Sequence, residues 1–386
     1  MLAAVADYRE LARRRLAAIA FDYLDRGAED GGAIARNRAA FDRVLFVPRV
    51  LRDVAAIDCA VEVLGTRQAL PLVVGPTGLN GLYWPRAEEA LARAAHRAGV
   101  PFVLSTASTS LLEDVRAASD GPLWLQLYVQ EDRAIAQDLM RRAAACGCTT
   151  LMLTVDTPVH GKRDHDTRNG FRLPLPLTPR LAWDLARHPR WCLRMLRQGG
   201  SPQLVNLARS AGVAPQLAHQ AAALSRRMDR RLTWEALAWL REHWHGKLLV
   251  KGLLAVADAE LALRHGADGI VLSNHGGRQL ESVPSALAML PAVRAAVGGR
   301  LEVLVDGGVR RGADIAKARA LGASAVLLGR APLYGLAARG EAGVDEVLRL
   351  LRDEFETTLR LLGLTTSMAL DATVLCDDTP ARLALP

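Results

Sequence analysis

Two side chains that can move protons and bind acids stand close together in SNHGGRQLE, residues 273–281. A neutral His275 imidazole can take a proton from a carbon or a hydroxyl, and the Arg278 guanidinium can hold a carboxylate through two parallel hydrogen bonds. A turn after the apolar run GIVL usually needs only one Asn or Gly, so both side chains exceed what folding requires. The stretch predicts proton transfer beside a bound carboxylate.

Two charged residues elsewhere in the chain could complete this chemistry. A base needs its tautomer fixed, and Asp156 is the carboxylate that we expect against the far ring nitrogen of His275. Lys251 could stabilise negative charge on an electron-rich cofactor, or it could be a Schiff-base lysine. The sequence leaves both roles of the lysine open.

Glycine-rich turns with arginines indicate a site for phosphate. They are DGGVRRG, residues 306–312, and LLGRA, residues 327–331. Glycines let backbone N–H groups approach an anion, and Arg310 and Arg330 add positive charge. The alternative is a pair of tight turns with solvated arginines. A phosphate-bearing ligand is the favoured interpretation.

Eight short apolar runs bounded by Gly and Pro must position these residues. They lie at 70–78, 101–108, 122–129, 150–158, 247–253, 269–277, 301–309 and 325–331. Amphipathic segments with helical period lie between them. Strands that are apolar on both faces and alternate with helices indicate a parallel sheet, so eight units predict an α/β fold, a closed (β/α)8 TIM barrel preceded by an N-terminal helical segment. An open doubly wound sheet is the alternative, but GPTGLNG (75–81) lacks its usual G-x-G-x-x-G loop.

Polar residues gather at the carboxyl end of each predicted strand. In a barrel these ends meet at one rim, where the active site of this architecture lies. The residues are Thr77, Gly78, Ser105, Gln126, Tyr128, Thr154, Asp156, Lys251, Ser273, His275, Asp306, Gly329 and Arg330.

The spacing between strands breaks once, after the fourth, where an insertion of about 160–246 is expected on the active-site rim. Within it, residues 171–210 carry seven arginines, one acidic residue and the tryptophans Trp183 and Trp191. A basic amphipathic segment with interfacial tryptophans predicts association with an anionic membrane surface without spanning it. An active-site lid and an oligomer contact are the alternatives.

Composition narrows the class of protein. The 386 residues, half of them apolar, are expected to form a single domain, 1–386. The net charge of +8 could suggest nucleic acid, but no recognised motif supports a nucleic-acid partner. Five cysteines without C-x-x-C or zinc-ligand spacing predict free thiols in a reducing compartment and no metal site. Neither a signal peptide nor a spanning helix is expected.

Several motifs together resemble one family. SNHGGRQLE, TVDTP, LVKGLL, LQLYV, DGGVRRG and FDYLDRGAED are similar to the FMN-dependent 2-hydroxy-acid dehydrogenases and oxidases, over about 7–364. The resemblance implies FMN as cofactor and oxidation of an (S)-2-hydroxy acid to the 2-oxo acid. An FMN-dependent isomerase on a related barrel is the distant alternative, although its diphosphate substrate would not need His275, Arg278 and Tyr23. A non-catalytic membrane-bound barrel is a third possibility.

The resemblance also assigns substrate contacts. It implies that Tyr23 and Arg278 bind the substrate carboxylate, with Arg163 as a second arginine nearby. Tyr128 would hydrogen-bond the substrate hydroxyl, and His275 would be the catalytic base. These side chains come from parts of the chain that are far apart in sequence.

For the cofactor, the resemblance implies that Lys251 lies by flavin N1 and O2 and stabilises the reduced flavin. Asp306 would hold the ribityl chain. The residues implied to contact the flavin ring region are Thr77, Gly78, Ser105, Gln126 and Thr154, with Ser273 nearby; those implied to bind the phosphate are Gly308, Arg310, Gly329 and Arg330.

Five stretches refine the resemblance within the family. Those that most resemble the bacterial membrane-associated (S)-mandelate dehydrogenases are PTGLNGLYWP (76–85), FVLSTAS (102–108), HPRW (188–191), TWEALAWLR (233–241) and LYGLAARGEAGVDEVL (333–348). This likeness implies oxidation of (S)-mandelate to benzoylformate, electron transfer to membrane quinone, peripheral attachment through 171–210 to the cytoplasmic face of the inner membrane, and a homotetramer. A quinone-linked L-lactate dehydrogenase, an oxidase that uses oxygen and a soluble cytoplasmic protein remain alternatives.

Overall fold

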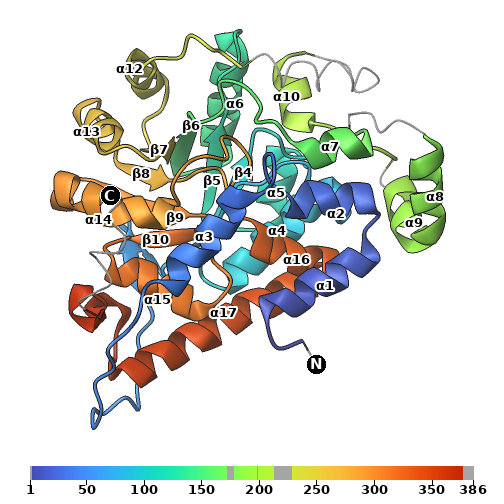
Figure 1. Ribbon diagram of the computed structural model, residues 1–386. Helices are drawn as coiled ribbons and strands as arrows, with labels where there is room; N and C mark the ends of the chain where they lie inside the picture. Colours follow the sequence, from blue (N-terminus) through green and yellow to red (C-terminus); the bar gives the residue numbers. More distant parts are fainter. Residues whose placement is uncertain (1, 172–177, 198, 213–227, 377–386) are drawn as a thin grey trace.

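A closed barrel of eight parallel strands forms the centre of the computed structural model, which describes residues 2–171, 178–197, 199–212 and 228–376 (Figure 1). The strands in order are β3 (Leu72–Val74), β4 (Phe102–Ser105), β5 (Leu123–Leu127), β6 (Thr150–Thr154), β7 (Lys247–Leu253), β8 (Gly269–Leu272), β9 (Glu302–Asp306) and β10 (Ala325–Leu328). Strand β10 pairs with β3 and closes the barrel. Each predicted apolar run contains one of these strands, so the predicted (β/α)8 barrel is confirmed.

All barrel strands except β7 are shorter than the apolar runs that predicted them. The run 70–78, for example, contains a strand of only three residues. A strand ends where its backbone pairing with its neighbours ends, and the polar residues that follow lie in loops. Ser105, Gln126, Thr154, Lys251 and Asp306 therefore lie within strand ends, while the other predicted rim residues lie in the loops or, for Arg330, at the start of a helix.

The inside of the barrel is a separate apolar cluster. Its centre is made by inward-pointing side chains such as Val73, Trp124 and Leu249. A short antiparallel hairpin, β1 (Val61–Val63) and β2 (Thr66–Gln68), adds further side chains to this cluster. The hairpin thus packs against the inside of the barrel, and the cavity that collects the polar strand ends opens at the carboxyl end.

Helices surround the barrel in the order that the sequence predicts. The outer layer consists of α4 (Ala87–Arg97), α5 (Leu112–Ala118), α6 (Arg133–Ala145), α12 (Glu235–His243), α13 (Val256–Arg264), α14 (Ala286–Val297), α15 (Gly312–Ala320), α16 (Arg330–Arg339) and α17 (Glu341–Leu362). Short 3-10 turns are η1 (Asn80–Leu82), η3 (Gly298–Arg300), η4 (Ser367–Ala369) and η5 (Ala372–Val374).

The N-terminal helical segment consists of α1 (Val5–Arg15), α2 (Ala18–Asp25) and α3 (Gly32–Asp42). Helix α1 lies along α16, and α2 and α3 cross towards the carboxyl ends of the strands (Figure 1). The segment therefore delivers side chains to the rim from outside the barrel.

The insertion lies between β6 and β7, after the fourth barrel strand, as predicted. It contains α7 (Asp164–Asn169), α8 (Pro179–Arg187), α9 (Pro189–Arg197) and α10 (Val205–Ser210), and α12 follows before β7. Within the predicted membrane segment 171–210, residues 172–177 and 198 lie outside the described residues. Over the part of the chain that is described, no helix is both long and apolar enough to cross a bilayer.

The two tryptophans of the insertion lie in different environments. Trp183 on α8 is 70% exposed, whereas Trp191 on α9 is 3% exposed and donates its indole N–H to the Leu82 carbonyl oxygen at 2.8 Å. The prediction of an interfacial tryptophan is therefore wrong for Trp191. A helix that docks on the barrel needs a buried face, and the sequence alone did not show which tryptophan lies on it.

Candidate active site

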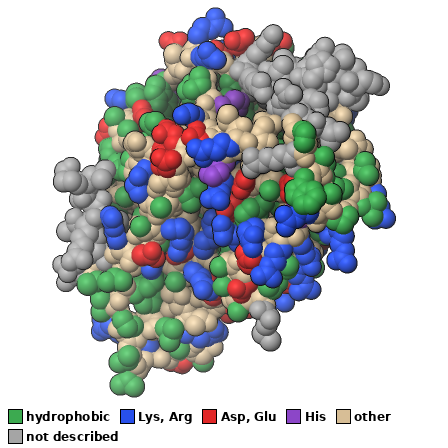
Figure 2. All heavy atoms as spheres, turned by 45° about the vertical axis from the view of Figure 1, so that its right-hand side comes forward, with side chains coloured by type: hydrophobic (Ala, Val, Ile, Leu, Met, Phe, Trp, Pro, Cys, Tyr) green, Lys and Arg blue, Asp and Glu red, His purple; other side chains and the backbone are tan. Residues whose placement is uncertain are grey.

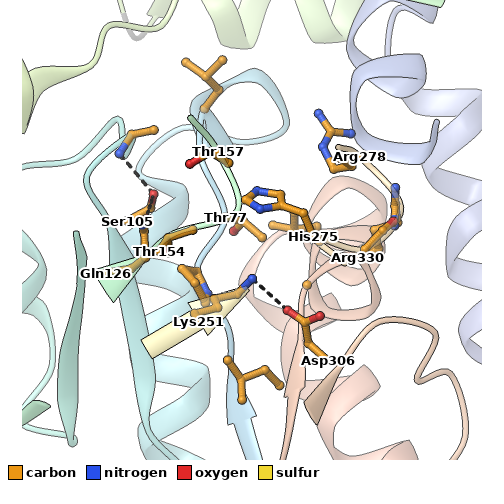
Figure 3. A pocket seen from close by; sticks show the side chains of 18 of the residues that line it. Thr77, Ser105, Gln126, Thr154, Thr157, Lys251, His275, Arg278, Asp306 and Arg330 are labelled. Carbon is orange, nitrogen blue, oxygen red and sulfur yellow. Dashed lines mark hydrogen bonds and ion pairs between the residues drawn. The ribbon is translucent and has the colours of Figure 1, made fainter. Parts of the chain in front are cut away.

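The carboxyl ends of the barrel strands surround a cavity of about 260 Å³ (Figure 3). Sixteen of the predicted site residues line it: Tyr23, Thr77, Gly78, Ser105, Gln126, Tyr128, Thr154, Arg163, Lys251, His275, Arg278, Asp306, Gly308, Arg310, Gly329 and Arg330. The two others, Asp156 and Ser273, lie directly behind this wall and contact residues in it. The structure thus brings every predicted site residue to one place.

His275 is held on both sides. Its Nδ1 lies 2.9 and 3.1 Å from the two carboxylate oxygens of Asp156, and its backbone N–H donates to Ser273 Oγ at 2.9 Å. Its Nε2 lies 3.4 Å from the Tyr128 hydroxyl. Gly252 makes room for the carboxylate, because a Cβ atom there would be 2.6 Å from Asp156 Cγ. The arrangement leaves Nε2 facing the cavity while Nδ1 is fixed.

Burial and neighbouring charge act in opposite directions on Asp156. Burial alone would raise the pKa of this carboxyl group, but His275 and Lys251 together lower its pKa below the usual value. Asp156 is therefore ionised at neutral pH and can stabilise a positive imidazolium. Burial raises the pKa of Tyr128, which keeps its hydroxyl protonated as a hydrogen-bond donor.

Lys251 is a buried, paired cation at the end of β7. Its Nζ donates to Ser273 Oγ at 2.9 Å and lies 3.1 Å from Asp306 Oδ2 (Figure 3). Burial would lower the pKa of the ammonium group, but Asp306 and Asp156 outweigh it and raise the pKa above its ordinary value. A Schiff-base lysine must lose its proton to become a nucleophile, so this environment favours the charge-stabilising role.

Two arginines make one corner of the cavity positive. The Arg278 guanidinium lies 4.8 Å from the centre of the Tyr23 ring, and that of Arg163 lies 5.8 Å from the same centre. Burial lowers the pKa of Arg278, because a buried charged group loses its hydration. The positive charge of Arg163 lowers it further, because two close cations repel. Arg163 pairs with Asp166 at 3.8 Å, whereas Arg278 donates to backbone carbonyl oxygens and has no carboxylate bonded to it among the described residues. This corner is suited to a ligand carboxylate.

A second positive end lies between β9 and β10. Gly307 and Gly308 have φ angles of 88° and 95°, which favour glycine, and a Cβ at Gly308 would be 2.5 Å from the Asn37 carbonyl oxygen. Arg330 begins α16, and burial lowers its pKa to about 10. Glycine turns, a helix N-terminus and the arginines Arg310 and Arg330 form a cradle of the kind that binds phosphate.

Sequence reasoning missed several residues of this site. Asn37 on α3 and Asn274 exchange two amide hydrogen bonds of 2.8 Å and tie the N-terminal segment to the loop after β8. Asn274 lies inside SNHGGRQLE and could have been found there, but nothing in the sequence marks Asn37. The insertion also reaches the cavity, where Leu204 and Leu207 line it. Among the described residues, no group of three His, Cys, Asp or Glu side chains could hold a metal ion.

Several buried polar atoms along the barrel rim have no hydrogen-bond partner in the protein, so they indicate which polar groups a ligand in the cavity should carry. Within the described residues these include Gln126 Nε2, Thr154 Oγ1 and Asp306 Oδ1, which come from β5, β6 and β9. Buried donors and acceptors in native proteins normally find a partner. A ring that carries several N–H and carbonyl groups, joined through a hydroxylated chain to a phosphate, matches these atoms and the cradle. The residues fit FMN.

This barrel and its cavity define a flavin-dependent oxidoreductase, and comparison with known proteins agrees. The chain belongs to the FMN-dependent dehydrogenase family, whose sequence profile matches residues 12–377, and FMN is its cofactor. The family resemblance predicted from the sequence is confirmed.

Individual relatives are similar over almost the whole chain. (S)-Mandelate dehydrogenase of Pseudomonas putida is 51% identical over 359 residues, 93% of this chain and 90% of the relative. L-Lactate dehydrogenase of Caulobacter vibrioides is 44% identical over 380 residues, 98% of this chain and 99% of the relative. The crystal structure of the monotopic membrane protein (S)-mandelate dehydrogenase superposes with a TM-score of 0.93 at 48% identity, covering 97% of this chain and 99% of that one.

Proposed function

We propose that the protein oxidises an (S)-2-hydroxy acid, with (S)-mandelate as the preferred substrate, to the 2-oxo acid. The observation that carries this proposal is the His275–Asp156 pair beside Arg278 in a cavity that fits FMN. The 51% identity to an (S)-mandelate dehydrogenase supports the choice of acid. L-Lactate is the second candidate, because L-lactate dehydrogenases of 44% identity match 98% of the chain.

The substrate would be oriented by its carboxylate. Arg278 and Arg163 would bind it together with Tyr23, whose ring lies close to both guanidinium groups. The Tyr128 hydroxyl and His275 Nε2 lie 3.4 Å apart, so both can reach one hydroxyl-bearing carbon. His275 Nε2 would accept the proton as general base, and Asp156 would stabilise the imidazolium that forms.

FMN, when bound, supplies a two-electron acceptor. Thr77, Gly78, Ser105, Gln126 and Thr154 would hold its ring region, with Ser273 behind them. Lys251 would contribute a fixed positive charge close to the ring, Asp306 would bind the ribityl chain, and the phosphate would lie among Gly308, Arg310, Gly329 and Arg330. An isomerase of a diphosphate substrate would leave the carboxylate corner at Arg278 without a purpose.

The insertion supports a peripheral membrane location. Trp183, Leu193 and Leu196 are exposed, and Arg187, Arg190 and Arg197 are exposed on the same two helices. Figure 2, which turns the side of α8 and α9 forward, shows basic and hydrophobic side chains on that face. Exposed apolar side chains flanked by cations suit an anionic bilayer surface. We therefore propose peripheral contact with the cytoplasmic face of the inner membrane. On the family resemblance we also propose membrane quinone as electron acceptor and a homotetramer.

Replacing His275 tests the proposed chemistry. We expect His275→Ala to bind FMN and remain folded but to lose reduction of the flavin by (S)-mandelate by a factor of about 10²–10⁴. The measurement is anaerobic stopped-flow absorbance of the flavin with detection of the 2-oxo acid. Unchanged reduction would remove His275 as the base.

Vesicle binding tests the membrane proposal. Trp183→Ser combined with Leu196→Ser should lower sedimentation with vesicles of anionic phospholipid, and Leu361→Ser on α17, also an exposed leucine, should not. Equal binding by the wild type, the Trp183 and Leu196 double variant and the Leu361→Ser variant would contradict attachment through α8 and α9. Sedimentation velocity of the detergent-solubilised protein tests the tetramer.

A further inference from the structure

The insertion has two parts that differ in their contacts. Helices α8 and α9 expose an apolar and basic face, whereas α10 is buried against the barrel layer, with Leu204 and Leu207 almost inaccessible. Both leucines line the FMN cavity. The second part of the insertion therefore belongs to the active site and not to the outer surface.

The Asn206 side chain makes four of the hydrogen bonds that attach α10 to the barrel layer. Asn206 Nδ2 donates to Ser108 Oγ at 2.7 Å and to the Ser110 carbonyl oxygen at 2.9 Å. Its Oδ1 accepts from the Leu112 N–H at 3.0 Å and from Arg142 Nη2 at 2.8 Å. All the hydrogen-bonding capacity of this buried side chain is used, so its orientation is fixed.

The ion pair between Arg142 and Glu113 holds the Asn206 side chain in place. Arg142, itself buried, holds Glu113 through two hydrogen bonds of 2.8 Å and also donates to Ser210 Oγ at 3.0 Å. Ser210 is the last residue of α10, so the helix is held at its first turn by Asn206 and at its end by Arg142. These contacts join α10 to α5, α6 and the loop after β4.

The position of the two leucines indicates what they contact. A 2-hydroxy acid bound by its carboxylate to Arg278 must point its side group away from the charged corner, into the uncharged part of the cavity. Apolar side chains of the cavity wall come from the loops at the barrel rim, as with Leu79 and Ala107, and from the insertion, as with Leu204 and Leu207. An aryl group buries more apolar surface against such a wall than a methyl group does.

We propose that Leu204 and Leu207 form a wall that selects a 2-hydroxy acid with a large apolar side group, and that Asn206 is the positioning residue of this wall. The proposal rests on the proposed function and specifies its substrate class. Truncating one side chain of such an apolar wall is expected to lower the ratio of kcat/KM between the large and the small acid on the order of tenfold.

The test compares two acids on purified, FMN-loaded, full-length protein. Leu207→Ala should raise the KM for (S)-mandelate about tenfold and leave the KM for (S)-lactate within about twofold. Leu204→Ala should act in the same direction, and it keeps the test valid if Leu207→Ala folds poorly. Leu361→Ala, an exposed leucine on α17, is the control and should change neither KM.

Asn206→Ala tests the positioning role, because it alters no residue of the wall. We expect the ratio of kcat/KM for mandelate to that for lactate to fall about as far as in Leu207→Ala. Equal losses on both acids would show a structural role only and would overturn the positioning claim. Unchanged selectivity in both leucine variants would remove the wall, whereas a wild type reduced by neither acid would remove the proposed function itself.

Discussion

The rim of the barrel and the insertion build one cavity by different means. On the rim, side chains are placed by strand register, as for Thr154 and Lys251, which are direct partners on neighbouring strands β6 and β7. In the insertion, α10 is placed by a few side-chain bonds centred on Asn206. The difference implies that the rim carries the chemistry common to the fold, while the insertion can alter specificity and location without disturbing it.

The largest expected effect concerns the rim. Asp156→Asn should slow flavin reduction by the substrate roughly 10³-fold, because a neutral amide cannot stabilise the imidazolium on His275. The measurement is the anaerobic reduction rate in stopped flow at saturating substrate.

A carboxylate at the opposite end of β7 provides the matched control. Asp268 accepts from the Leu248 N–H at 2.8 Å and from Lys247 Nζ at 3.2 Å, far from the rim. Asp268→Asn should lower the unfolding midpoint and leave the reduction rate unchanged. Similar losses of the flavin reduction rate in Asp156→Asn and Asp268→Asn would mean that the rim is not chemically distinct from the rest of the barrel.

The next effect separates the docked and exposed sides of the insertion. Trp191→Ala should lower the free energy of unfolding by about 3–5 kcal/mol, because it leaves a cavity and breaks the hydrogen bond to Leu82. Trp183→Ala should change it by less than about 0.5 kcal/mol. Urea denaturation of the two variants measures the difference, and equal values would show that α9 is not docked as described.

The smallest effect is the pH dependence of the α10 attachment. The hydrogen-bonded Arg142 lowers the pKa of Glu113 from its ordinary value of 4.5 to about 2. Because the pKa of Glu113 is lower in the folded protein than in the unfolded chain, the ionised carboxylate stabilises the fold at pH values above 4.5. This stabilisation is lost as the pH falls from 4.5 through about 2. Wild type should therefore be more stable than Glu113→Gln at pH 7, with the gap closing below pH 4.5. A gap that grows in acid would contradict the ion pair.

The sequence predicted the parts of the molecule that repeat or that carry chemistry. Eight apolar runs predicted the barrel, because a strand buried on both faces leaves an uninterrupted apolar stretch. Asp156 and His275 could be paired before the structure was known, because the ends of parallel strands meet at one rim. Their contact of 2.9 Å and the position of Arg278 follow that expectation.

What the sequence could not show depends on single long-range contacts. The hairpin β1–β2 is too short to leave a pattern, since each strand has three residues. Trp191 and Trp183 look alike in a basic amphipathic segment, and only docking on Leu82 distinguishes them. Asn206 is an ordinary polar residue until its partners on α5 and α6 are known.

The most direct test of the account is an anaerobic titration of the FMN-loaded protein with (S)-mandelate, (S)-lactate and glycolate in parallel. Bleaching of the flavin absorbance, fastest with mandelate and matched by formation of the 2-oxo acid, is the predicted result. Slow return of the colour in air would support a dehydrogenase, and rapid return an oxidase. Absence of bleaching by every 2-hydroxy acid would contradict the central claim that the His275, Asp156 and Arg278 site oxidises these acids through FMN.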